Sequence, residues 1–231
     1  MKRVDIIRYL ILRTVGNFLV LFALFGVGAT FGPTLYYEIV FHIQQAQGMQ
    51  YVVADPPTIS HPDNPAQSDQ LCSLVHANKD NILIPKDTFF DVLIPKIGAN
   101  ARVFPNVDST NEDEYLKVLQ KGVAHAKGSV FPGIPGTTYL FAHSTDSFID
   151  VGRYNAVFYL LKDLNPGDQV VIFYQNKRYN YTVAQTKITD GNDVSYLTHA
   201  HEGPEQLVLQ TCWPPGTAWK RLLVIAKPVG K

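Results

Sequence analysis

Charge and sulfur are both scarce in this chain. Only 17% of its 231 residues are charged, and 20 basic residues are balanced by 20 acidic ones. A balanced charge provides no general attraction to nucleic acid, so we expect no nucleic-acid partner. Two cysteines are too few for a disulfide framework or a four-cysteine zinc site. With 46% hydrophobic residues the chain can bury a core, which excludes a disordered polyelectrolyte.

The few charges are distributed unevenly. Residues 1–14 carry a net charge of +3, and no charged residue lies between Arg13 and Glu38. This uncharged stretch of 24 residues exceeds the ~20 that a helix needs to cross the hydrocarbon core. Basic residues before such a span favour a cytoplasmic N-terminus. We therefore predict a cytoplasmic basic segment at residues 1–14 and a single transmembrane anchor at residues 15–37.

Two alternatives to an anchor stay open: a buried core helix and a cleaved signal peptide. Val27 and Ala29 are small enough for a cleavage site. The apolar run continues past Ala29, which favours an uncleaved anchor. With an anchor or a signal peptide, the rest of the chain is exported and becomes extracellular. A disulfide between Cys72 and Cys212 is permitted there.

The exported part divides into two regions by composition. Residues 38–47 resemble a short helix, and residues 54–70 contain four prolines and several turn formers. Such a composition is typical of a linker with little core of its own. We predict an extracellular linker or stalk at residues 38–80 and one domain at residues 81–231.

Short apolar runs, rich in β-branched and aromatic residues, dominate this domain. Runs of this kind predict strands, here at residues 82–84, 89–94, 101–104, 137–142, 169–175, 178–186, 206–211 and 222–227. Two stretches, 111–121 and 154–164, look helical. Many closely spaced strands with few helices favour a closed barrel over a doubly wound sheet. The predicted fold class is mainly β: a closed β-barrel of about eight strands with two short helices, preceded by one transmembrane helix.

Three residue types with catalytic potential lie at predicted strand ends. Cys212 ends one apolar run, and Arg221 opens the next after the intervening residues 213–220. If the two strands are antiparallel neighbours, the loop returns Arg221 to the rim where Cys212 lies. A guanidinium there can stabilise a thiolate or an oxyanion. His143 ends another predicted strand and could exchange a proton with a thiol or an amine.

These residues occur in motifs that resemble the sortases, the membrane-anchored cysteine transpeptidases of bacterial cell surfaces. Residues 208–212 read Val-Leu-Gln-Thr-Cys, which matches three of the four specified positions of the family motif Thr-Leu-x-Thr-Cys. Arg221 follows as in the family. Residues 141–144 read Phe-Ala-His-Ser, where the family more often has Ala-Gly-His. Residues 121–129 resemble the family segment Gly-Val-Gly-His-Tyr-Pro-Gly-Thr, with His125 at its histidine and departures on either side.

The resemblance implies a sortase-like barrel and a specific reaction. A sortase cleaves a C-terminal sorting signal such as Leu-Pro-x-Thr-Gly in a secreted protein and joins the new carboxyl end to an amine of the cell wall or of a pilin. The implied partners are thus sorting-signal proteins, an amine acceptor and the lipid bilayer. The implied catalytic residues are Cys212, His143 and Arg221. No cofactor is implied, and the class of sortase is left unassigned.

Further roles follow from the same resemblance. Leu209 and Thr211 would line the peptide groove, and His125 would either contact or support it or have a role in structural packing. Apart from the resemblance, Trp213 directly follows Cys212 and could screen the thioester from water. Residues 190–205 would form the loop that shapes substrate choice.

Other interpretations are weaker. An L,D-transpeptidase would carry its cysteine in a Ser-x-Gly-Cys context, which is absent from the sequence. A non-catalytic anchored β-domain that binds a surface partner, or a sortase that has lost activity, remains an alternative. His199 and His201 could bind a metal, but no third ligand stands out, and we predict no metal site.

Overall fold

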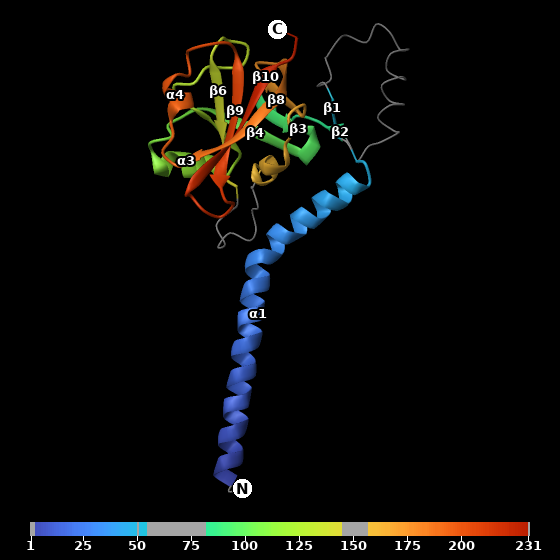
Figure 1. Cartoon of the computed structure of the whole chain (residues 1–231), viewed down its shortest axis with the longest axis vertical. Helices are drawn as coiled ribbons and strands as arrows, with labels where there is room; N and C mark the ends of the chain where they lie inside the picture. The colour runs from blue at the N-terminus through green and yellow to red at the C-terminus, as the bar shows by residue number, and fades with distance from the viewer. Residues whose placement is uncertain (1–2, 50, 55–81, 145–156, 231) are drawn as a thin grey trace. The chain divides into compact units, whose positions relative to one another are not determined.

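The computed structural model describes residues 3–49, 51–54, 82–144 and 157–230. The chain has two compact units, Met1–Met49 and Gln50–Lys231. The first contains the helix α1 (Arg3–Ala46; Figure 1). Within α1, Ile6–Ala29 is a 24-residue stretch of mean hydropathy 2.0 whose side chains are not buried. In the described part of the chain this is the one helix long and apolar enough to span a bilayer. It begins before the predicted span at 15–37.

The helix also continues past the predicted span into the first residues of the predicted linker. The sequence there contains the good helix formers Glu, Gln and Ala. Glu38 and His42, one turn apart, approach within 3.6 Å. The predicted short helix at 38–47 is therefore the last part of α1. Most of the remaining linker, residues 55–80, lies outside the described residues.

The second unit contains a closed barrel of eight strands (Figure 1). Its order is β10-β8-β7-β3-β4-β5-β6-β9, and the last strand pairs with the first. The pairs β4/β5 and β6/β9 are parallel and the others antiparallel. In chain order the strands are β3 (Phe90–Ile94), β4 (Ala99–Val107), β5 (Val123–Ala126), β6 (Thr137–Phe141), β7 (Gln169–Tyr174), β8 (Lys177–Asp190), β9 (Gln206–Trp213) and β10 (Lys220–Pro228). The predicted fold class is confirmed.

The part of the barrel wall formed by β5, β6, β9 and β10 is buried on both faces. Side chains alternate along a strand, and Leu207 and Leu209 of β9 point into the interior cluster. Burial of each such side chain contributes about 1.5–3 kcal/mol. Val208, between them, belongs to a second cluster on the outer face of β5, β6, β9 and β10. The helix α3 (Glu112–Leu119) packs on this outer face.

Several predicted elements differ from those observed. Residues 82–84 form a strand, β2 (Ile82–Leu83), but it pairs with β1 (Val52–Val53) rather than joining the barrel. The eighth barrel strand is β5, which the sequence pattern did not indicate because two of its four residues are alanine, a poor strand former. Gly122 precedes it, and a Cβ there would clash with the carbonyl oxygen of Arg102.

The structure also refines the prediction of the short helices. The predicted helix at 111–121 is α3, and Asn111 caps it by accepting a hydrogen bond from the Glu114 N–H at 3.3 Å. The predicted helix at 154–164 is a short 3₁₀ helix, η3 (Tyr159–Asp163), in the residues described there. Two further one-turn elements, η2 (Pro95–Ile97) and α4 (Ser195–Thr198), were not predicted.

Candidate active site

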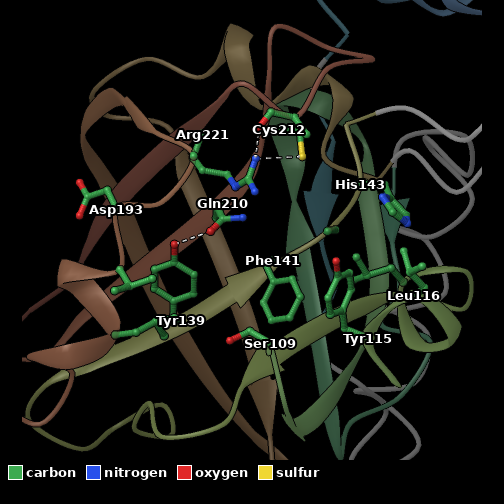
Figure 2. Close-up of a pocket in the computed structure, with 16 residues that line it drawn as sticks. Ser109, Tyr115, Leu116, Tyr139, Phe141, His143, Asp193, Gln210, Cys212 and Arg221 are labelled. Atoms are coloured by element: carbon green, nitrogen blue, oxygen red, sulfur yellow. Dashed lines mark hydrogen bonds between the residues drawn. The ribbon is translucent and has the colours of Figure 1, made fainter. Parts of the chain in front are cut away.

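Cys212 and Arg221 are direct cross-strand partners. β9 and β10 are antiparallel neighbours, and their register pairs Cys212 with Arg221. The Nη1 atom of Arg221 donates to the Sγ atom of Cys212 at 3.6 Å (Figure 2). Cys212 is a free cysteine with a partly exposed side chain. The predicted return of the chain to the same rim is thus observed, and the sulfur faces a permanent positive charge.

Arg221 is held in place by the turn between the two strands. Its Nη1 atom also donates to the carbonyl oxygens of Ala218 at 3.1 Å and of Lys220 at 3.3 Å. Gly191, in the loop after β8, lies against this turn, since a Cβ there would come within 3.1 Å of the Ala218 and Trp219 carbonyl oxygens. These contacts orient the guanidinium toward the sulfur and reduce the rotamer freedom that a surface arginine would otherwise retain.

His143 lies in the same pocket, on the side opposite Arg221 (Figure 2). It follows β6 by two residues, and β6 runs parallel to β9. The preceding residue, Ala142, is tied to β9 on both sides: its N–H donates to the Gln210 carbonyl at 3.1 Å, and its carbonyl accepts from the Thr211 hydroxyl at 3.1 Å. Main-chain and side-chain bonds therefore fix the backbone that carries His143 relative to Cys212.

The pocket has a volume of about 390 Å³ and lies between α3, the barrel wall and the loop after β8. Its lining is largely apolar and aromatic, with Tyr139, Phe141 and Tyr115 side by side, and Figure 2 shows Arg221 between Cys212 and Asp193. The lining residues other than Cys212, His143 and Arg221 are Ser109, Tyr115, Leu116, Leu119, Tyr139, Phe141, Ala142, Gly191, Asp193, Val194, Leu197, Gln210 and Ala218. Such a groove suits an extended peptide with apolar side chains.

The ionisable side chains that line the pocket differ in their charge at neutral pH. The Asp193 carboxylate accepts from the Ser195 N–H at 3.0 Å, and hydrogen bonds from Ser195 hold the pKa of Asp193 below its ordinary value. Burial raises the pKa of the Tyr115 and Tyr139 hydroxyls. At neutral pH the pocket therefore carries a carboxylate at Asp193, the cation of Arg221 and two neutral phenols.

Three of the predicted substrate-binding residues do not line this pocket. Leu209 and Thr211 are buried on the opposite face of β9 from Cys212, because side chains alternate along a strand. Trp213 is half-buried and packs against the interior cluster of the barrel. Leu209 and Thr211 thus lie in the buried barrel wall and not in the lining of this pocket. Screening of a thioester by Trp213 stays a prediction.

His125 is the fourth predicted substrate-binding residue outside the pocket lining. It is fully buried in β5, and its ring stacks on Phe131 with centroids 4.5 Å apart. Its Nδ1 atom accepts from the Asn106 N–H at 3.2 Å, so Nε2 carries the proton and faces the Val130 carbonyl at 3.1 Å. Burial lowers the pKa of the His125 imidazole. The histidine joins two segments of the barrel wall and does not reach the groove.

The pocket also contains residues that the sequence analysis did not single out. Gln210 precedes Cys212 by two residues and so shares its strand face, a relationship that β-alternation could have revealed. Tyr115, Leu116 and Leu119 come from α3, and only tertiary packing determines which side of this helix faces the pocket. The predicted specificity loop at 190–205 contributes Gly191, Asp193, Val194 and Leu197 to the lining.

Within the described residues, no group of three histidine, cysteine or acidic side chains is arranged to hold a metal ion. The Nδ1 atom of His199 contacts the Ser195 carbonyl and the Thr198 hydroxyl, each at 3.0 Å. Cys72, the other half of the disulfide that the sequence permits, lies outside the described residues.

Known proteins are similar to this chain over much of its second unit. The family model of the sortase domain matches residues 92–229. Sortase D of Bacillus subtilis is 34% identical over 139 residues, which cover 59% of this chain and 61% of that protein. The chain thus spans about three fifths of the length of this curated relative.

Solved structures resemble the barrel as well. Sortase C1 from Streptococcus agalactiae aligns with a TM-score of 0.50 and 27% identity, over 61% of this chain and 67% of that one. Sortase C-1 from Actinomyces oris aligns with a TM-score of 0.51 and 22% identity, over 71% of this chain and 83% of that one. At 22% identity, the similarity to the Actinomyces oris protein shows a shared fold alone.

Proposed function

The chain belongs to the sortase family, and we propose on that premise that it is a membrane-anchored cysteine transpeptidase. It cleaves an LPxTG-like sorting signal and transfers the acyl group to an amine. The observation that carries this proposal is the hydrogen bond of 3.6 Å from Arg221 to the Cys212 sulfur, in a pocket that His143 also lines. A nucleophile, a proton carrier and a fixed cation that can stabilise an oxyanion are together sufficient for acyl transfer.

In the first half of the reaction, the Cys212 thiolate attacks the carbonyl carbon of the threonine in the signal. The bond from sulfur to carbon forms, and the carbonyl electrons move onto oxygen. Arg221 offers N–H donors and positive charge to this oxyanion. When the tetrahedral intermediate collapses, the C–N bond breaks and His143 gives a proton to the departing glycine amine. The acyl group remains on Cys212 as a thioester.

In the second half, an amine attacks the thioester carbon. His143 accepts a proton from the attacking nitrogen, and the sulfur leaves as a thiolate. A thioester is a better acyl donor to amines than the corresponding serine ester, which gives a chemical reason for cysteine at position 212. The acceptor we propose is an amine of a cell-wall peptide or a pilin lysine. Sortase C of Streptococcus pneumoniae, which is 25% identical to this chain and is described with a pilin substrate, supports the latter choice.

The proposed location is the cell membrane, with the N-terminus in the cytoplasm and the barrel outside. The stretch Ile6–Ala29 has 24 residues, equivalent to about 36 Å of helix at 1.5 Å per residue, against a hydrocarbon core of about 30 Å. The basic residues at the N-terminus support this orientation. Anchoring enzyme and substrate to one membrane raises the effective concentration of each for the other.

The test uses the full chain in detergent, a panel of quenched sorting-signal peptides and a soluble amine. We expect peptide cleavage, a conjugate with the amine, and an acyl-enzyme on Cys212 detected by mass spectrometry. Cys212→Ala should abolish all three. Cys72→Ala is the matched control, and it should retain them. If no peptide is cleaved and the Cys212 thiol is inert toward alkylating reagents, the proposal fails, and a non-catalytic anchored binding domain becomes the better interpretation.

A further inference from the structure

Gln210 occupies a place that the reaction outlined above does not use. It precedes Cys212 by two positions on β9, so both side chains leave the same face of the strand. Two residues of a strand span about 6.6 Å. Gln210 lines the pocket together with Cys212, and its cross-strand neighbour on β6 is Phe141. Its side chain therefore faces the same pocket as the Cys212 sulfur.

The orientation of the Gln210 carboxamide is set by Tyr139. The Tyr139 hydroxyl donates to the Oε1 atom of Gln210 at 2.6 Å. Tyr139 is buried, and burial raises the pKa of its hydroxyl, so it remains a donor at neutral pH. Figure 2 shows the Gln210 oxygen directed at Tyr139 and the nitrogen directed away from it, into the pocket. The carboxamide thus presents its two N–H groups, and not its carbonyl, to a ligand.

These N–H groups have no partner in the described part of the chain. The one side-chain hydrogen bond of Gln210 is the bond that its oxygen accepts from Tyr139. Tyr139 lies 71 positions earlier in the chain, on β6. A donor that is held in one orientation, partly withdrawn from water and left without an acceptor suits an acceptor supplied by a ligand.

The peptide of the proposed reaction provides such an acceptor. In a sorting signal of the LPxTG type, the proline lies two residues before the threonine whose carbonyl Cys212 attacks. Proline has no N–H but keeps its carbonyl oxygen. An extended peptide rises ~3.3 Å per residue, so this carbonyl falls about as far from the scissile bond as Gln210 lies from Cys212. Leu116, Leu119 and Phe141 line the same region and suit the apolar side chains of the signal.

We propose that Gln210, oriented by Tyr139, is a specificity-determining residue that donates a hydrogen bond to the main-chain carbonyl of the peptide about two residues before the scissile bond. This inference rests on the proposed function. It assigns to Gln210 the recognition of the acyl part of the substrate and no role in the departure of the glycine or in the arrival of the amine.

The test measures peptide binding separately from catalysis. The full chain carrying Cys212→Ala is held in detergent, and its Kd for a fluorescent sorting-signal peptide is measured by anisotropy. Adding Gln210→Met, which keeps the length of the side chain but removes the donors, should raise Kd about tenfold, the usual effect of losing one hydrogen bond. Gln210→Glu should raise it further, because a carboxylate repels a carbonyl oxygen.

Two comparisons separate recognition from a merely structural effect. The first uses a peptide whose proline carbonyl is replaced by a thioamide, a weaker acceptor. It should bind the parent less tightly than the normal peptide does, whereas Gln210→Met should bind both peptides equally. The second uses Tyr139→Phe, which frees the carboxamide to rotate. It should raise Kd, and Gln210→Met should then add less than it does alone, because contacting residues are energetically coupled.

The outcomes distinguish this inference from the proposed function. Equal Kd values for the parent and both Gln210 variants overturn the inference alone. The same follows if Gln210→Met weakens the normal and the thioamide peptides to the same degree, because a packing defect would do that. Binding of no sorting-signal peptide by the parent overturns the proposed function and this inference with it.

Discussion

Arg221 lies directly opposite Cys212 in the β9/β10 register, and its Nη1 atom is 3.6 Å from the Cys212 sulfur. The same nitrogen contacts two carbonyl oxygens of the turn that joins the strands. The cation is thus fixed before a substrate arrives, which is the condition for strong electrostatic stabilisation of a transition state.

The first prediction concerns Arg221. Arg221→Gln keeps a donor but removes the charge, and we expect kcat for peptide cleavage to fall by about 10²–10³-fold, the usual loss when one oxyanion donor is removed. The measurement is steady-state cleavage of a quenched peptide by the full chain. Unchanged melting temperature would confirm that the loss is chemical. A loss of less than threefold would show that Arg221 takes no part in the reaction.

The second prediction separates proton donation by His143 from other roles. His143→Asn should slow cleavage of an amide peptide by about 10²–10⁴-fold, because the departing amine must be protonated. Acylation of Cys212 by an activated thioester of the same peptide should be much less affected, since that leaving group departs without a proton. Acyl-enzyme formation by rapid mixing and mass spectrometry measures both. Equal losses with the two donors would argue against His143 as the acid.

The third prediction contrasts two leucines. Leu209 is fully buried, so Leu209→Ala should lower the free energy of unfolding by about 2–5 kcal/mol. Leu116 lines the pocket but is 36% exposed, so Leu116→Ala should change stability little and weaken peptide binding instead. Chemical denaturation and peptide anisotropy provide the two readings. Reversed effects would mean that Leu209, and not Leu116, contacts the peptide.

The fourth prediction concerns pH and a buried carboxyl group far along the barrel wall from Cys212. Asp91 is fully buried on β3; its Oδ2 accepts from the Lys86 N–H at 2.6 Å, and its Oδ1 has no hydrogen-bond partner in the described residues. Burial raises the pKa of Asp91 from 3.8 to about 6. Between these values the folded chain retains a proton that the unfolded chain has released.

The stability that the Asp91 proton contributes is therefore complete below pH 3.8 and is lost as the pH rises through about 6. Over that window the loss is on the order of 3 kcal/mol, at about 1.4 kcal/mol for each pH unit between the two pKa values. Asp91→Asn should remove this slope from the free energy of unfolding, measured by denaturant titration at a series of pH values. Identical pH dependence in the two proteins would contradict the assignment.

Local sequence patterns predicted much of the barrel and three residues, Cys212, His143 and Arg221, that line one pocket. Seven of the eight barrel strands coincide with runs of β-branched and aromatic residues, since those residues suit a pleated, half-buried surface. The missed strand, β5, is four residues long and rich in alanine, and only its neighbours β4 and β6 make it a strand. β2 shows the converse, because its partner β1 lies about thirty residues earlier and no local pattern indicates their pairing.

The same division applies to the site. The chain order of Cys212, a short connection and Arg221 predicted a shared rim if the two strands are antiparallel neighbours, because an antiparallel connection returns to its starting edge. The structure supplied that pairing. Motif likeness placed Leu209, Thr211 and His125 at the groove, but a motif records neither the face of a strand nor burial. His125 is enclosed by Phe131 and the barrel wall, which only the packed structure reveals.

The sequence by itself thus determined the apolar helix, the mainly β character of the domain and the pairing of a cysteine with an arginine, because each depends on residues close together in the chain. The tertiary structure decided what surrounds them. The scarcity of charge in the sequence leaves few ionic groups for a pocket, and folding places the cation of Arg221 beside the sulfur and the carboxylate of Asp193 in the loop after β8. The orientation of Gln210 by Tyr139 joins residues 71 positions apart, and only the closure of β6 against β9 brings them into contact.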